Sequence, residues 1–581
     1  MNGSLKSILW RTLITAACII VIAACFYSEE NWRGMRAWTD CQRELETRGE
    51  KLDWTNYIPP PVPDDQNFFT ASPKITANFI KVRNDAESES FAKQPRFQFV
   101  LTDTNSFPEF DTTGGKPLVV AQLTVLPAGA GLKSTNTNRI FKLNDPDASD
   151  QIGKLIQKTA GQSANGSMGF EFSEIQLGNL VPAQIVVEAD NPPSIQDLEN
   201  FIPPDTATNI GHLQIEATVD KGTFQVLFTG VHITAAADYL KWSDQFVPEF
   251  DEIREALKRP DAIIPGDYSQ SYLVPIPNFV LIRELAETLA QRTQCYLLLG
   301  QPDKALRELT LMHDICRILV RPPAGKPITL FEAMINVAVG GLYVATVADG
   351  MRLHAWREPQ LAAIQKQLEE INFLPIVASS LRSERAMVCH TLATVPLEKI
   401  VNTYNHPTAS DLGSWFVPSG WVYQNMAVVA TLEQNSIECL DSTNDQIFPY
   451  KVESAEFNIQ QTLRHITPWN FLAAIAIPNF ARATETMARN QTLANEAQIA
   501  CALERYRLAN GKYPDTLAAL TPQFIEKLPH DIIGGKPLIY SCKDGQTFLL
   551  YSIGWNEVDD GGLESENPLT EGDWVWQHPA K

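Results

Sequence analysis

Apolar and polar positions follow different patterns in successive parts of the chain, and the first is a single uncharged stretch near the N-terminus. It covers residues 12–27 and follows Lys6 and Arg11. It reaches about 20 residues, the length of a membrane-spanning helix, when residues 8–10 are counted across Arg11, whose long side chain can extend to the lipid interface. The pattern predicts a transmembrane signal anchor over residues 1–28.

Two other fates of this segment remain open. The sequence Ile22-Ala23-Ala24-Cys25 is similar to the lipobox of bacterial lipoproteins, in which an acylated Cys25 would be the first mature residue. Cleavage of an ordinary signal peptide is the third alternative. In all three the positive residues stay inside the cell. We therefore expect a single-pass protein of the inner (cytoplasmic) membrane with its bulk extracytoplasmic, or a lipoprotein anchored at Cys25.

The next segment, residues 29–66, joins a charged stretch to a proline-rich one. The charged part ends near Asp53 and carries Trp32 and Trp38, which predicts a juxtamembrane helix. The sequence Ile58-Pro59-Pro60-Pro61-Val62-Pro63 favours a stiff, extended backbone. We expect this spacer to hold the body away from the membrane.

A period of two indicates a β-rich domain over residues 67–235. Alternation over 118–125 predicts a strand that is buried on one side. Residues 212–230 alternate on both sides of Asp220-Lys221-Gly222, a turn sequence, and predict a β-hairpin.

The period becomes helical over residues 236–468. Apolar positions recur on one stripe up to Gly300, which ends a helix, and Pro302 opens the next. This predicts an antiparallel helical hairpin. Further helices are expected over 329–350, 358–372, 376–402 and 420–435.

The C-terminal part, residues 469–581, carries the most specific motifs. The run Leu472-Ala473-Ala474-Ile475-Ala476-Ile477-Pro478-Asn479-Phe480 stands at the start of a segment that stays helical to Leu508, and Asn510-Gly511-Lys512-Tyr513-Pro514 follows it. These residues resemble the first helix and the turn of type IV pilins and type II secretion pseudopilins. The resemblance implies a pilin-like α+β head, a long helix lying on a small antiparallel sheet.

One part of the family pattern is missing. Pilins have about 20 apolar residues after a cleavable basic leader, whereas here Arg464-His465-Ile466-Thr467-Pro468-Trp469-Asn470 precedes an apolar run of only Phe471–Ile477. Such a run is too short to span a membrane. We expect a pilin-like head whose own anchor has been replaced by a helical body.

The resemblance also implies a calcium loop, because major pseudopilins often bind calcium after their last strands. The matching residues here are Asn556, Asp559, Asp560 and Ser552. Carboxylate, amide and carbonyl oxygens are the ligands that calcium prefers. Asn556 stands where the family usually has Asp, and a solvated acidic turn is the alternative.

Composition and charge exclude some functions. The chain has 581 residues, 20% of them charged, and a formal net charge of −21. A dedicated nucleic-acid binder needs a basic surface, so none is expected. Sequence signatures of zinc proteases, α/β-hydrolases, P-loop NTPases and dinucleotide-binding folds are absent. The nine cysteines contain no CxxC pair, and we favour buried free thiols over the pairs Cys295–Cys316 and Cys501–Cys542.

Three clusters could carry chemistry. An acidic stretch over residues 244–255 could mimic paired catalytic carboxylates, although a solvated helix face is the simpler interpretation. Trp415, Trp421 and Tyr423 could line a sugar groove or form an aromatic core cluster. The neighbours Cys389 and His390 should point to different faces of a helix.

Taken together, these patterns predict a multidomain α+β protein with an N-terminal transmembrane anchor, a β-rich domain, an α-helical (helical-hairpin) domain and a C-terminal pilin-like α+β domain. The whole chain resembles large membrane-anchored bacterial envelope proteins that reuse this head. We expect a non-enzymatic, membrane-tethered scaffold or interaction protein of the cell envelope. Its expected partners are the lipid bilayer and the proteins of a secretion or pilus-like machine. An exported enzyme or binding protein acting on envelope or polysaccharide material is the alternative.

Overall fold

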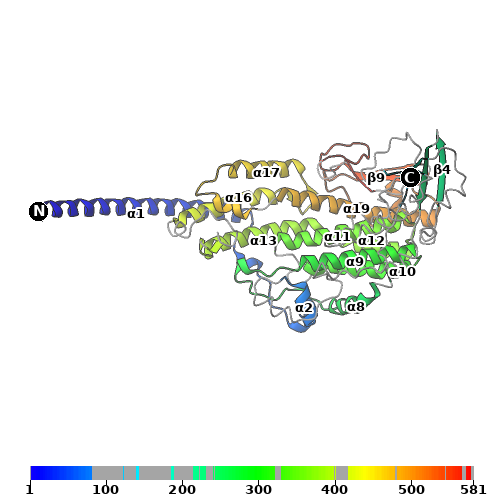
Figure 1. The fold of residues 1–581 in the computed structure, drawn as a ribbon, viewed down its shortest axis with the longest axis horizontal. Helices are drawn as coiled ribbons and strands as arrows, with labels where there is room; N and C mark the ends of the chain where they lie inside the picture. The colour runs from blue at the N-terminus through cyan, green and yellow to red at the C-terminus, as the bar shows by residue number, and fades with distance from the viewer. Residues whose placement is uncertain are drawn as a thin grey trace.

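The computed structural model describes residues 2–81, 122–123, 139–142, 185–188, 214–220, 223–229, 240, 243–320, 329–397, 399–400, 417–477, 480–543, 545–565 and 571–576. Within these residues the protein is mostly helical, with small sheets and an apolar N-terminal helix. Figure 1 shows an elongated body of helices that lie side by side, with the N-terminal half of helix α1 projecting from one end.

Eleven described α-helices follow α1 (Asn2–Thr47). They are α2 (Pro73–Phe79), α8 (Val247–Ala256), α9 (Phe279–Leu298), α10 (Pro302–Arg317), α11 (Leu330–Arg352), α12 (Glu358–Glu369), α13 (Phe373–Thr394), α16 (Ser419–Ile437), α17 (Pro449–Leu463), α18 (Phe471–Ala476) and α19 (Phe480–Asn510). The predicted helical hairpin is confirmed as α9 and α10, and the four further helices correspond to α11, α12, α13 and α16.

Local sequence explains several helix ends. The side chain of Asn278 caps α9 by accepting from the backbone N–H of Leu281. Thr329 and Glu332 form a reciprocal capping box at the start of α11. After α19, Gly511 adopts a φ of +78°, a left-handed conformation that suits glycine and ends the helix.

Helix α11 is apolar on all sides because it lies in the centre of the body. It is long and apolar enough to cross a membrane, but 67% of its most apolar window is buried inside the protein. It packs against α9, α10, α13 and α19. The apolar segment of α1 differs, because only 6% of its window is buried.

Ten described strands form three small sheets. They are β1 (Gln122–Leu123), β2 (Arg139–Lys142), β3 (Ile185–Glu188), β4 (Gln214–Asp220), β5 (Thr223–Thr229), β6 (Leu440–Asp441), β7 (Gln446–Ile447), β8 (Ile539–Lys543), β9 (Thr547–Ser552) and β10 (Trp574–Val575). The predicted hairpin is confirmed as the antiparallel pair β4–β5, with Asp220 opposite Thr223. The strand predicted over 118–125 is described only at β1, and its other residues lie outside the described ones.

The start of the predicted β-rich domain is helical instead. Residues 67–80 form the 3-10 turn Phe68–Thr70 and helix α2, whose N-terminus is capped by Ser72. Phe68, Phe69 and Phe79 are buried in the same core as α8 and α9. These aromatic residues therefore belong to the helical body.

The proline-rich segment also lies on the body. Trp54, in the 3-10 turn Trp54–Tyr57, is fully buried, and its indole N–H donates to the carbonyl of Tyr268 at 2.7 Å. Pro59 is buried as well. The segment that we expected to act as a spacer therefore packs along the protein, because its aromatic neighbour finds an apolar site there.

The C-terminal region combines a helix and a small sheet, with one interruption. Strands β8, β9 and β10 form an antiparallel sheet in the order β10–β9–β8. The helix expected from Leu472 is not continuous, because α18 ends at Ala476, Ile477 is extended, and α19 begins at Phe480. Residues that precede a proline avoid the helical conformation, and Ile477 precedes Pro478.

One apolar core runs through most of the body. It contains residues from both sides of the predicted domain boundary at residue 468. Helix α19 buries Ala497, Ile499, Ala500 and Leu503 against α11 and α12. The same core cluster extends to Leu550 and other residues of the C-terminal sheet. The C-terminal region, residues 469–581, and the helical region therefore share their interior.

Candidate functional site

The main candidate site is a cleft of about 630 Å³ between α9, α11, α19 and the C-terminal segment around β10. Small-molecule sites in proteins typically have volumes of about 300–1,000 Å³. Figure 1 shows these helices in the half of the body that is farther from the N-terminus. Half-buried apolar side chains form much of its wall, among them Phe279, Leu342, Ala345, Leu493 and Val575.

Two ion pairs lie in the wall of this cleft. On α9, the Nε of Arg283 donates to Glu287 at 2.6 Å. On α11, Arg352 pairs with Asp349, which also accepts from the amide of Gln294 at 2.6 Å. These contacts neutralise two of the three arginines that line the cleft.

The third arginine, Arg489 on α19, has a different environment. It makes no ion pair and no hydrogen bond with any described residue, and its Nε is buried without an acceptor. Burial lowers the pKa of the Arg489 guanidinium, and the more distant Glu564 and Glu496 only partly offset this effect. Burial also raises the pKa of Glu496 well above its usual value and so favours its neutral form.

Two more N–H donors of the cleft residues lack an acceptor among the described residues. They are the Nε of Arg352 and the indole Nε1 of Trp576, which is 3% exposed. Buried donors without partners are rare in folded proteins and call for an explanation. The described lining residues include no histidine or cysteine. The arrangement therefore suits the binding of an acceptor-bearing ligand.

A second feature is the junction between α1 and the body. The carboxylate of Glu30 accepts from the indoles of Trp421, at 2.8 Å, and Trp469, at 3.3 Å. The side chain of Asn31 accepts from the backbone N–H of Gly420 at 2.9 Å. Gly34 contacts the backbone of Gly420, where a Cβ on either residue would collide. These contacts fix α1 to α16 immediately after its exposed apolar segment.

The predicted calcium ligands lie in one loop but bond mostly to the loop itself. Asp559 accepts from Tyr551 and from the backbone N–H of Gly561, both at 3.0 Å. Asn556 donates to Asp560 at 3.1 Å. Ser552 is fully buried, and its hydroxyl accepts from Gly554.

Asp573 completes this loop, and the sequence patterns did not single it out. It accepts from the backbone N–H groups of Gly562, at 2.6 Å, and Asp560, at 3.3 Å. Burial raises the pKa of Asp573, although these N–H donors act in the opposite direction. Among the described residues, no group of three or more acidic, histidine or cysteine side chains has a metal-binding arrangement.

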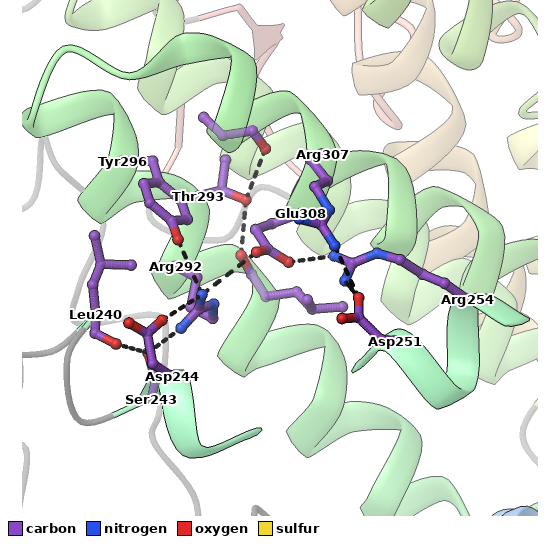
Figure 2. A network of polar contacts seen from close by, with 12 residues as sticks. Leu240, Ser243, Asp244, Asp251, Arg254, Arg292, Thr293, Tyr296, Arg307 and Glu308 are labelled. Carbon is purple, nitrogen blue, oxygen red and sulfur yellow. Dashed lines mark hydrogen bonds and ion pairs between the residues drawn. The ribbon is translucent and has the colours of Figure 1, made fainter. Parts of the chain in front are cut away.

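The acidic stretch over residues 244–255 forms ion pairs, and Figure 2 shows those of Asp244 and Asp251. Glu249 of this stretch is buried. Buried Arg292 donates to Ser243 at 2.6 Å and to Asp244 at 3.1 Å, and Glu308 lies 3.5 Å away. Asp251 accepts from two arginines, and Glu249 pairs with Lys74 at 2.8 Å. The carboxylates are thus engaged by cations and not by each other.

The remaining predicted clusters separate in the fold. Trp421 lies at the junction with α1, Tyr423 is half-buried on α16, and Trp415 lies outside the described residues. The thiol of Cys389 faces the carbonyl of Met426, whereas His390 contacts Ser271 at 2.9 Å. All nine cysteines are free thiols.

The free thiols include both pairs that we considered as alternatives. Cys295, Cys316 and Cys501 are buried, and burial raises the pKa of each thiol, to about 12 for Cys316.

Comparison with family models, with curated proteins and with solved structures finds no match for this chain.

Proposed function

We propose that the protein is a non-enzymatic, membrane-tethered scaffold or interaction protein of the bacterial cell envelope. The observation that carries this proposal is the continuous helix α1. Its apolar segment is exposed, with Ile20 and Ile22 at 67% and 68%, whereas Trp38 and Leu45 further along are buried against the body. Exposed apolar surface on this scale is costly in water and suits a lipid environment.

The docked half of α1 is compatible with each fate of the N-terminus. Its contacts with the body begin at Phe26, whose ring lies edge-on to that of Trp421, and continue at Glu30. Cleavage before Cys25 would leave this docked part intact, with a lipid on Cys25 replacing the spanning helix. An uncleaved anchor would place the body directly at the outer surface of the inner membrane.

Membrane extraction and mass spectrometry test the tether. We expect the chain to stay in the membrane pellet after alkaline carbonate treatment and to keep residues 1–28 in its intact mass. A variant that lacks residues 2–28 and carries a cleavable export signal is the control, and it should be released. Release of the natural chain by carbonate would contradict the proposal, and a mass beginning at an acylated Cys25 would replace the spanning helix with a lipid anchor.

We propose further that the C-terminal region contacts a secretion or pilus-like machine. Its resemblance to pseudopilin heads supports this idea, and Leu563 in this region is 69% exposed. A photo-crosslinking amino acid at Leu563 should capture pseudopilin-machine components in native membranes, while one at Leu273 should not. Their absence from the Leu563 crosslinks would count against the link with secretion.

Calcium binding by Asn556, Asp559, Asp560 and Ser552 is also a proposal. The family resemblance and the gathering of these oxygens in one loop support it. Binding would require Asp559 and Asp560 to exchange their present partners for the ion. A calorimetric titration without heat, together with an unchanged thermal midpoint at millimolar calcium, would remove it.

The cleft supports a second candidate function, that of a binding protein for a small molecule. The cavity volume and the unpaired N–H donors of Arg489 and Trp576 favour it. A tethered scaffold and a ligand-binding protein are compatible, because α1 packs chiefly against α16, whereas α9, α11, α19 and the segment around β10 line the cleft.

A further inference from the structure

The charge balance of the cleft between α9, α11 and α19 is uneven. Arg283 and Arg352 each have a carboxylate of their own helix as partner. Arg489 has no carboxylate within ion-pair distance among the described residues. Its nearest acidic neighbours act only over a longer range, and one of them, Glu564, is exposed at the surface.

An arginine that is partly buried without a counter-ion is unfavourable in a folded protein. Removing a guanidinium from water costs free energy that a paired carboxylate normally offsets. The body offers a comparison, because buried Arg385 donates to Glu50 at 2.6 Å and to Gln434. Arg489 lacks such partners, so an anion in the cleft would supply what the described residues do not.

The geometry of the donors agrees with an anionic ligand. Arg489 on α19, Arg352 on α11 and Trp576, which directly follows β10, line the same cavity. Each has a buried N–H without an acceptor among the described residues. A guanidinium presents its N–H groups in a planar fork that matches the oxygens of a carboxylate or a phosphate.

The rest of the wall is apolar. Leu342 and Ala345 on α11, Leu493 on α19 and Val575 on β10 face the same cavity and are only half-buried. Covering such side chains with an apolar group is favourable because it removes apolar surface from water. A ligand with an apolar body would therefore bind more tightly than a bare ion.

We propose that this cleft binds an amphipathic organic anion, a molecule in which one carboxylate or phosphate group is joined to an apolar body. The anionic group pairs with Arg489, and the apolar body lies along Leu342, Ala345 and Leu493. The site does not depend on the membrane tether, because none of the residues that line the cleft belongs to α1.

Calorimetry on the full chain in lipid nanodiscs tests this site, with empty nanodiscs as the blank. The probes are octanoate and octyl phosphate, which share a tail, and octanol, which has the tail without the charge. We expect saturable binding of at least one anion and at least about tenfold weaker binding of octanol. The two anionic probes distinguish a carboxylate from a phosphate ligand.

Variants locate the binding. Arg489→Met should lower the affinity for the anion by about tenfold or more. Arg489→Lys should lower it less than Arg489→Met does, because lysine keeps the positive charge. Ala345→Phe fills the cavity and should abolish binding of every probe. Arg482→Met, at an exposed position of the same helix, is the matched control and should bind as the natural chain does.

Each other result overturns the proposal. Equal affinity for octanol and the anions would show that charge is not recognised, and no saturable binding of either anion would show that the cleft is not such a site. Unchanged binding in Arg489→Met and Ala345→Phe would place the ligand elsewhere. Thermal unfolding of every variant, recorded without probes, separates lost binding from lost folding.

Discussion

At the scale of single residues, buried arginines occupy two kinds of environment. Arg292 is 1% exposed, and although burial alone would disfavour its charge, Glu308, Tyr296 and Asp244 raise the pKa of its guanidinium above the usual value. For Arg489 the balance is reversed, and the pKa is lowered. The first arginine joins α9 to Glu308 of α10 and to Asp244, whereas the Nε of the second has no acceptor among the described residues.

The network around Arg292 provides a stability prediction. The carboxylate of Glu308 lies 3.5 Å from Arg292 and 2.7 Å from Arg254. Glu308→Gln removes its charge and leaves both arginines without this partner. We expect a loss of about 3 kcal/mol in the free energy of unfolding, because breaking a buried pair on one side is strongly destabilising. Chemical denaturation measures it. Lys258→Ala, which removes an exposed pair with Glu255, should change stability by less than about 0.5 kcal/mol.

Glu284 predicts a dependence of stability on pH. Burial, with a contribution from Glu287, raises the pKa of Glu284 from 4.5 to about 7. The folded chain therefore holds a proton that the unfolded chain releases, so this contribution to stability is complete below pH 4.5 and is lost as the pH rises through 7.

Thermal midpoints measured from pH 4 to 8 test whether the contribution of Glu284 to stability falls as the pH rises. The neutral variant Glu284→Gln should lose less stability than the natural chain between pH 4.5 and 7. Glu255→Gln, at an exposed position, is the control and should follow the natural profile. Parallel curves for the natural chain and Glu284→Gln would contradict the assignment.

At the scale of elements, the contact between α1 and α16 is unusually close at one point. Gly34 and Gly420 let the two backbones touch, and a Cβ on either would collide with backbone atoms of the other helix, which cannot move aside as a side chain can. Polar contacts of Glu30 and Asn31 lie on one side of this point, and Trp38 and Leu45 pack on the other. The docking of α1 thus depends on two glycines.

This contact can be tested through a neighbouring cysteine. Gly420→Ala should push α1 from α16 and expose Cys41, whose thiol now lies 3.8 Å from the carbonyl of Ala427. We expect maleimide labelling of Cys41, followed by peptide mass spectrometry, to become several times faster. Glu46→Ala, at an exposed position of α1, should leave the labelling rate unchanged, and an unchanged rate in Gly420→Ala would refute the role of the contact.

Local patterns predicted elements well where the signal lies within a few residues. Gly300 and Pro302 separate α9 from α10, and the turn sequence Asp220-Lys221-Gly222 predicted the antiparallel pairing of β4 with β5. The interruption of the helix at Ile477 was not predicted. Pro478 is a local signal for such an interruption, but the resemblance to the pilin family favoured a continuous helix.

The residues of the candidate site could not be predicted from local sequence patterns. The wall of the cleft brings together Arg283, Asp349 and Arg489 from three separate helices and Trp576 from the segment after β10, and none of them stands in a motif. The bond between Glu30 and Trp421 joins residues 391 positions apart. The acidic stretch over 244–255 was visible, but its cations come from other elements, so its pairing could not be inferred from composition.

At the scale of the whole molecule, the shared core has a consequence for folding. Helix α19 packs against α11 and α12, and its buried Gln491 and Gln498 donate to the carbonyls of Ile371 and Leu368 in the helical body. A fragment of residues 469–581 would lose this packing and expose this face of α19 to water. We therefore expect it to lack a cooperative thermal transition, unlike an independent pilin head.

Circular dichroism of the isolated fragment, with the full chain as the reference, checks this prediction. The complementary fragment that ends at residue 468 should also lose stability, because α11 and α12 lose their packing with α19. A fragment of 469–581 that unfolds cooperatively at the temperature of the full chain would show that the two regions are independent units.

The docked half of helix α1 would transmit motion of the proposed membrane segment to the body. From Glu30 to Thr47 it spans roughly 27 Å at 1.5 Å per residue, and the chain has no flexible joint between the exposed apolar segment and this docked length. If the apolar segment spans the membrane, any tilt forced on it by bilayer thickness or by a neighbouring helix turns the entire body by the same angle. The far end, with the cleft and the C-terminal sheet, would then move through the widest arc, so membrane composition would set which surfaces a neighbouring complex can reach.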